Sequence, residues 1–80
     1  MEKIFTVVET TQDYKGVYTT VWGASKNKET AKKILKDAVL ELNEYEEERY
    51  EEGLQDNGDW VRNDDDIYQT IAIYETELED

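Results

Sequence analysis

Hydrophobic and polar residues alternate near both ends of the chain, whereas hydrophobic residues recur every three or four positions in the middle. Residues 4–10 and 17–22 are rich in β-branched and aromatic side chains, which favour strands. Between them, residues 11–16 carry turn-forming side chains and end at Gly16, which adopts a positive φ without steric cost. The pattern predicts a β-hairpin over about residues 4–22.

The middle of the chain has the period of an amphipathic helix. Either Ser25 or Asn27 supplies the N-cap, and Gly53 is the expected terminator in the left-handed region. The spacing predicts one helix over about residues 28–52. The stripe that faces the core consists of Ala31, Ile34, Leu35, Ala38, Val39, Leu42, Tyr45 and Arg49.

Residues 53–66 form a polar, acidic loop in which Trp60-Val61 is either a short strand or a packing contact. Residues 67–77 alternate again and predict a C-terminal strand. The alternation places Ile67, Gln69, Ile71 and Ile73 on one face, opposite Tyr68, Thr70, Ala72 and Tyr74.

The order β-β-α-(β)-β predicts a single α+β domain over residues 1–80. In this domain an antiparallel sheet of three to four strands carries one long helix on one face. The other face carries Tyr and Thr, and it is either half-exposed or covered by a second copy of the chain.

Composition narrows the class of protein. The chain has 80 residues, a net charge of −12, a hydrophobic fraction of 38% and an aromatic fraction of 11%. The lack of Cys excludes disulfides and thiolate chemistry, and the lack of His removes the commonest acid–base catalyst. We find no apolar run of about 18 residues and no secretory signal. These features predict a cytoplasmic binding protein that is not an enzyme and needs no cofactor.

Charge is distributed unevenly along the chain. Residues 1–36 hold all seven lysines and four acids, a net charge of +3. Residues 37–80 hold seventeen acids against Arg49 and Arg62, a net charge of −15. On one helix, lysines near the N-terminus and glutamates near the C-terminus oppose the macrodipole, at a cost of a few tenths to about 1 kcal/mol each. Stability alone does not favour this arrangement, which suggests a role in binding.

Acidic side chains form a second stripe beside the apolar one. Successive members are four or three residues apart, which on a helix gives a rise of about 5–6 Å per step. Duplex DNA carries one charge per strand every ~3.4 Å along its axis, so such a carboxylate row suits a phosphate-binding channel. The members of this stripe are Asp37, Glu41, Glu44, Glu48 and Glu51 (or Glu52).

The loop after the helix extends this acidic surface and adds an aromatic residue that is able to anchor a partner. The acids repel polyanions, so we expect no direct binding to nucleic acid. The predicted partner-binding residues are Asp37, Glu41, Glu44, Glu48, Glu51, Glu52, Asp56, Asp59, Trp60, Asp64, Asp65 and Asp66.

Two other interpretations of the acids stay open. The acids can serve solubility alone. Weak binding of a divalent cation at Asp64-Asp65-Asp66 is a further hypothesis, although the loop lacks the ligand spacing of an EF-hand and we predict no specific metal site.

A compact, acidic domain without Cys and with a Glu-rich helix, here Glu41 to Glu52, resembles the small phage-encoded inhibitors that mimic DNA, among them many anti-CRISPR proteins and inhibitors of restriction enzymes. The resemblance implies a non-enzymatic inhibitor that occupies the nucleic-acid channel of its target. The favoured partner is a CRISPR effector nuclease, and the implied location is the cytoplasm of the bacterial host.

The alternative function is a small structural or adaptor module that associates with itself and whose acids serve solubility. Such a module would dock through the Tyr-rich face of the sheet, with Tyr18, Trp22 and Tyr74 as contact residues. It would not bind a membrane.

Overall fold

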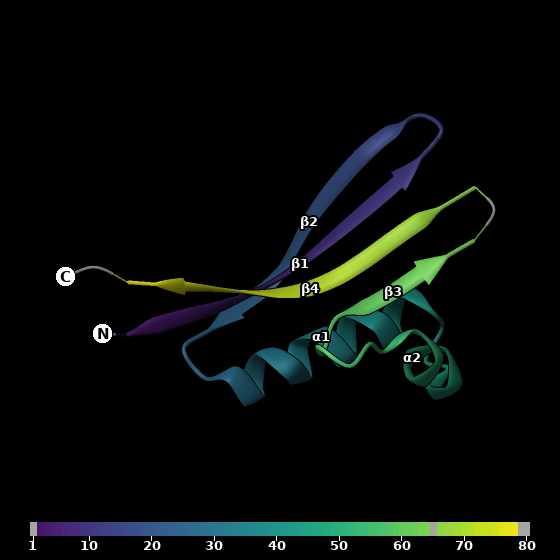
Figure 1. Ribbon diagram of the computed structural model, residues 1–80. Helices are drawn as coiled ribbons and strands as arrows, with labels where there is room; N and C mark the ends of the chain where they lie inside the picture. The colour runs from purple at the N-terminus through teal and green to yellow at the C-terminus, as the bar shows by residue number, and fades with distance from the viewer. Residues whose placement is uncertain (1, 65, 79–80) are drawn as a thin grey trace.

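The computed structural model describes residues 2–64 and 66–78, which form one four-stranded sheet and two helices (Figure 1). The predicted α+β class is confirmed, and Trp60-Val61 belongs to a short strand. Within the described residues, no helix combines the length and the apolar character needed to cross a bilayer. The elements in chain order are β1 (Lys3–Asp13), β2 (Gly16–Ser25), α1 (Lys28–Leu42), α2 (Glu47–Gly53), β3 (Trp60–Asn63) and β4 (Tyr68–Glu77).

The sheet has the strand order β2-β1-β4-β3, and every neighbouring pair is antiparallel. The hairpin between β1 and β2 turns at Tyr14 and Lys15, where Asp13 Oδ1 accepts hydrogen bonds from the backbone N–H groups of Lys15 (2.8 Å) and Gly16 (3.2 Å). The first and last strands, β1 and β4, lie side by side at the centre of the sheet (Figure 1). The sheet therefore depends on contacts between the two ends of the chain.

The register assigns each side chain to one of two faces, because residues directly opposite each other on neighbouring strands share a face. On the face covered by α1, Val7 of β1 lies opposite Ile73 of β4. A register shift between Val7 and Val8 leaves Trp22 as an extra residue in β2. The Trp22 indole lies on the helix-covered face, where its Nε1 donates a hydrogen bond to Glu9 Oε1 (2.8 Å).

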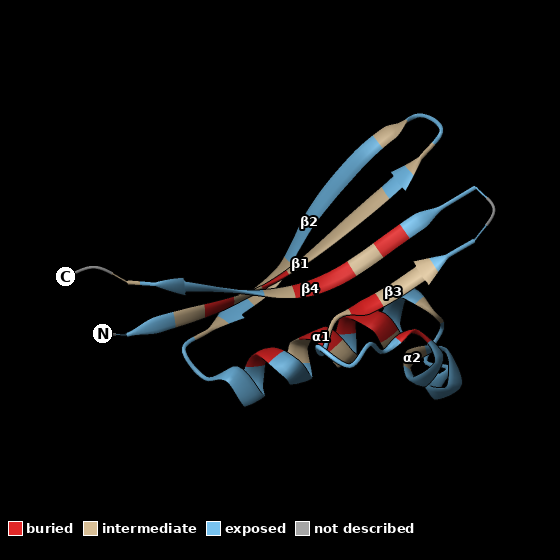
Figure 2. Cartoon of the chain, viewed as in Figure 1, coloured by how far each residue is buried: buried red, intermediate tan, exposed pale blue. Residues whose placement is uncertain are grey.

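The core fills the space between α1 and the sheet (Figure 2). Its buried members are Phe5, Val7, Ala31, Leu35, Ala38, Val39, Trp60 and Ile71. The predicted helical stripe is confirmed from Ala31 to Val39, but Leu42 and Tyr45 are 38% and 73% exposed. The stripe loses contact with the core at the point where the helix ends.

The N-terminus of α1 is capped as the sequence predicts. Asn27 is the N-cap, and its Oδ1 accepts hydrogen bonds from the backbone N–H groups of Glu29 (2.8 Å) and Thr30 (3.3 Å). Ser25, the other candidate, accepts a hydrogen bond from the Asn27 N–H (3.0 Å). Both residues therefore stabilise the entry into the helix.

The helical region contains two helices and not the one long helix predicted over residues 28–52. Glu44 and Tyr45 adopt φ values of 56° and 63°, in the left-handed region. The Tyr45 N–H donates a hydrogen bond to the Leu40 carbonyl (2.6 Å), as in a Schellman motif, and Asn43 Nδ2 donates to the Val39 carbonyl (2.8 Å). The chain therefore turns after Leu42 without a glycine.

This break changes the electrostatics of the helical region. Glu46 is the N-cap of α2, and Glu47 and Glu48 lie in its first turn, where the macrodipole favours negative charge. The predicted conflict with a helix C-terminus is therefore wrong for Glu47 and Glu48.

Both helices keep a part of the predicted conflict. The N-terminal half of α1 carries lysines and its last turn holds Glu41 and no basic residue. The last turn of α2 holds Glu51 and Glu52 and no basic residue.

Gly53 ends α2 for a different reason from the one predicted. Its φ is not among the positive values of the described residues. A Cβ atom at Gly53 would overlap the Trp60 indole and would lie 2.7 Å from the Val61 carbonyl oxygen. The position needs glycine because the sheet and the Trp60 ring approach the helix closely.

Replacing Glu44 with Gly is expected to raise the free energy of unfolding by about 1 kcal/mol relative to Glu44→Gln, because glycine adopts a positive φ without the steric cost that other residues have. Both variants remove the same charge, so their difference in urea denaturation isolates the backbone effect. Equal stability of the two variants would contradict the strain at this turn.

Replacing Gly53 with Ala is expected to lower the free energy of unfolding by about 1–3 kcal/mol, because the added methyl group overpacks the contact with Trp60. Glu51→Ala, at an exposed position of the same helix, is the control and should have little effect. A stability gain in Gly53→Ala would mean that helix propensity outweighs the overlap.

Candidate protein-binding surface

The densest group of carboxylates lies on α2 and the turn before it. Residues 44–52 hold six glutamates and one arginine, and all six glutamates are exposed. Four of them lie on α2 at spacings of three and four residues, which brings their Cβ atoms within about 5–6 Å of one another. We call Glu44, Glu46, Glu47, Glu48, Glu51 and Glu52 the acidic patch.

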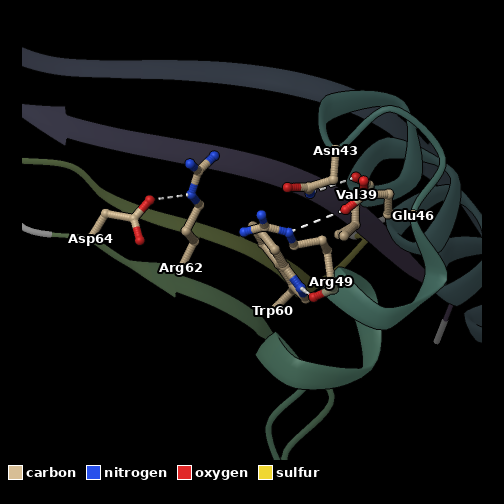
Figure 3. A network of polar contacts seen from close by, with 7 residues as sticks. All are labelled: Val39, Asn43, Glu46, Arg49, Trp60, Arg62 and Asp64. Atoms are coloured by element: carbon tan, nitrogen blue, oxygen red, sulfur yellow. Dashed lines mark hydrogen bonds and ion pairs between the residues drawn. The ribbon is translucent and has the colours of Figure 1, made fainter.

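Contacts with the core hold the acidic patch in place (Figure 3). The Trp60 indole Nε1 donates a hydrogen bond to the Arg49 carbonyl oxygen (3.1 Å) in the middle of α2. The Tyr50 side chain packs against the core, and Lys36 Nζ lies 5.4 Å from the centre of its ring. A helix of seven residues is not stable alone, so these contacts are what keep α2 helical.

Two arginines neutralise part of the acidic charge. Arg49 Nε lies 3.3 Å from Glu46 Oε2, and Arg62 Nε lies 2.7 Å from Asp64 Oδ2 (Figure 3). Both arginines line a shallow pocket together with Glu52 and Asp64. Exposed ion pairs of this kind contribute little to stability. The other five glutamates of the acidic patch form no ion pair within the described residues.

The turn between α2 and β3 places two predicted site residues beside basic ones. The Gly58 N–H donates a hydrogen bond to the Gln55 carbonyl (3.0 Å), which closes the turn that carries Asp56. Asp56 and Asp59 line a groove of about 390 Å³ that also contains Lys28 and Lys32 of α1. Lysine charge therefore offsets the acidic charge at this end of the molecule.

The predicted carboxylate row is divided among three elements. Asp37 and Glu41 lie on the exposed side of α1, Glu44 lies in the turn, and Glu48, Glu51 and Glu52 lie on α2. The row is not straight, because the helix breaks between Glu41 and Glu48. The structure keeps the acids exposed but concentrates them on α2.

The remaining acids of the predicted site lie in the turn between β3 and β4. Asp64 and Asp66 are exposed, and both line a shallow pocket beside Asp13 of the β1–β2 hairpin. Asp65 lies outside the described residues. Over residues 2–64 and 66–78, no group of three carboxylates is placed so that it could hold a metal ion.

Trp60 does not lie at the surface, so its predicted role as a partner-binding residue is wrong. Its side chain is only 2% exposed, and the ring packs between α2 and the sheet. The single tryptophan in a polar stretch is a core residue that positions the acidic helix.

The predicted set of partner-binding residues omitted three exposed residues of this region. Glu46 and Glu47 belong to the acidic patch, and Tyr45 is 73% exposed within it. On a continuous helix Tyr45 falls on the apolar stripe and the two glutamates fall outside the acidic one. In the structure all three are exposed and lie in or next to the turn at residues 43–46, where the helix is interrupted.

The outer face of the sheet is a second candidate surface. No helix of the described residues packs on it, and Val17, Val21, Tyr68 and Tyr74 are 61%, 63%, 47% and 55% exposed there. Of the three contact residues predicted for this face, only Tyr74 lies on it. Tyr18 and Trp22 belong to the opposite face, because Tyr18 pairs with Thr11 and Trp22 bonds to Glu9.

Comparison of the chain with protein-family models, with curated proteins and with solved structures found no match. Its function is therefore inferred from its own charge distribution and geometry.

Proposed function

We propose that the chain is a non-enzymatic inhibitor that binds a nucleic-acid-processing protein through the acidic patch. The favoured target is a CRISPR effector nuclease, whose nucleic-acid channel is cationic. The patch acts there as a substitute for the phosphate backbone and competes with nucleic acid for the same cations.

The observation that carries this proposal is a concentration of charge on an anchored helix. Residues 44–52 hold six carboxylates against Arg49 alone, a net charge of −5 within nine residues. Charge of this density attracts a cationic partner over a distance of about a Debye length and raises the rate of association.

The way α2 is attached also supports a binding role. A flexible acidic tail would lose conformational entropy when it docks, whereas α2 is already ordered by the Trp60 hydrogen bond and by Tyr50. Its carboxylates are therefore presented with little further loss of freedom. Tyr45, which is 73% exposed among these acids, supplies an aromatic contact of the kind that often dominates binding energy.

A second candidate function is a structural or adaptor module whose acids serve solubility. The exposed Val and Tyr side chains of the outer face favour it, because apolar surface gathered on one face often marks a contact with another protein. This candidate assigns binding to the outer face and no specific role to the acidic patch.

The test is a triple variant, Glu48→Gln, Glu51→Gln and Glu52→Gln, which removes three charges from α2 and keeps side-chain shape. The probe is a guide-loaded CRISPR effector nuclease, and binding and DNA cleavage are measured at low and high salt. We expect the variant to bind about tenfold more weakly at low salt and to show a smaller loss of affinity as salt rises.

The matched control is Glu2→Gln, Glu29→Gln and Glu77→Gln, which removes three charges from exposed positions outside α2. The control should keep nearly full affinity. Unchanged binding by the α2 variant, or an equal loss in the control, would contradict recognition through the acidic patch.

A further inference from the structure

The strand β2 leaves one side of its backbone unpaired. It forms one edge of the sheet, and within the described residues it pairs with β1 alone. It is ten residues long, and Val17, Tyr18 and Val21 are 61%, 52% and 63% exposed. A long edge strand with free N–H and C=O groups is a template for pairing with another strand.

The other edge of the sheet is protected against such pairing. The strand β3 has only four residues and contains Arg62, which pairs with Asp64. At its first residue, Trp60, an isolated bridge to Leu54 occupies the outer side. Shortness, charge and a covering segment are the usual ways of blocking an edge, and β2 has none of these in its central part.

The charge of β2 also sets it apart from the rest of the molecule. The segment from Gly16 to Ser25 contains no charged residue, although the whole chain carries −12. A partner strand at this edge therefore meets no charged side chain of β2. A second copy of the chain fits this edge, because two such strands pair without placing like charges against each other.

We propose that β2 pairs antiparallel with β2 of a second copy of the chain, about a two-fold axis through Thr19. In this register Val17 lies opposite Val21 of the partner subunit, and Val21 lies opposite Val17 of the partner subunit. The four valines form one strip on the outer face. The Tyr18 side chain then lies opposite Thr20 of the partner subunit. The two sheets join into one continuous sheet of eight strands.

This dimer leaves the acidic patch free. The strand β2 lies at the opposite edge of the sheet from β3, and α2 packs beside β3 (Figure 1). The two acidic patches are therefore at the two outer ends of the dimer. The proposed dimer does not depend on the proposed inhibitor function. An experiment can contradict one of these proposals and leave the other standing.

The test uses the two-fold axis itself. In the dimer, Thr19→Lys places two lysines directly opposite each other, and Thr19→Glu places two glutamates there, whereas in the monomer each side chain is on an exposed edge. Sedimentation velocity over a range of concentrations should show a monomer–dimer equilibrium for the wild type. Each variant alone should raise the dimer dissociation constant about fivefold. An equimolar mixture of the two should bring this constant back to within about twofold of the wild-type value.

Recovery in the mixture also shows that both variants fold. The matched control is Thr76→Lys, which adds the same charge at an exposed position of β4 and should leave the equilibrium unchanged. Higher salt should strengthen the dimer, because two copies of charge −12 repel each other. This salt effect has the opposite sign to that expected for a cationic target.

Two outcomes would overturn the proposal. One is a wild type that remains monomeric at millimolar concentration. The other is a dimer that persists in each Thr19 variant measured alone but is lost in Tyr74→Glu. This result would place the interface on the outer face, away from the β2 edge.

Discussion

The Trp60 indole is the contact on which the rest of the structure depends. It is the largest fully buried side chain, and it belongs at once to the core, to the edge strand β3 and to the contact with α2. Its Nε1 hydrogen bond to Arg49 fixes the middle of a helix that is too short to persist alone. Gly53 is required by the same ring. The position of the four glutamates of α2 therefore depends on one buried aromatic side chain.

Elements with a strong local period could be predicted from the sequence. The alternation in β1, β2 and β4 and the stripe from Ala31 to Val39 correspond to real strands and a real helix, because burial on one face imposes the period on the residues. The exposure of the acidic side chains of α2 could also be predicted, since carboxylates are rarely buried unless they are paired.

The helix break and the location of Trp60 could not be predicted in the same way. The break occurs at Glu44 and Tyr45, which are not residues that mark a left-handed turn, and the helical spacing of apolar residues continues past it. The burial of Trp60 depends on packing between segments that are distant in the sequence. Both features follow from tertiary contacts, and they decide where the acids lie. For this reason the candidate site was less predictable than the fold.

The central pair of strands has a consequence for how the protein is made. Because β1 and β4 are neighbours, with Lys3 opposite Glu77, the core remains open until the last strand has been synthesised. The β1–β2 hairpin and α1 leave the ribosome first, and their apolar faces stay exposed to solvent until β4 follows. Pairing between strands so far apart in sequence is slow, because a long loop must close before it gains any contact. Folding of this sheet is therefore expected to wait until β4 has been synthesised, and a chaperone has an interval in which to bind.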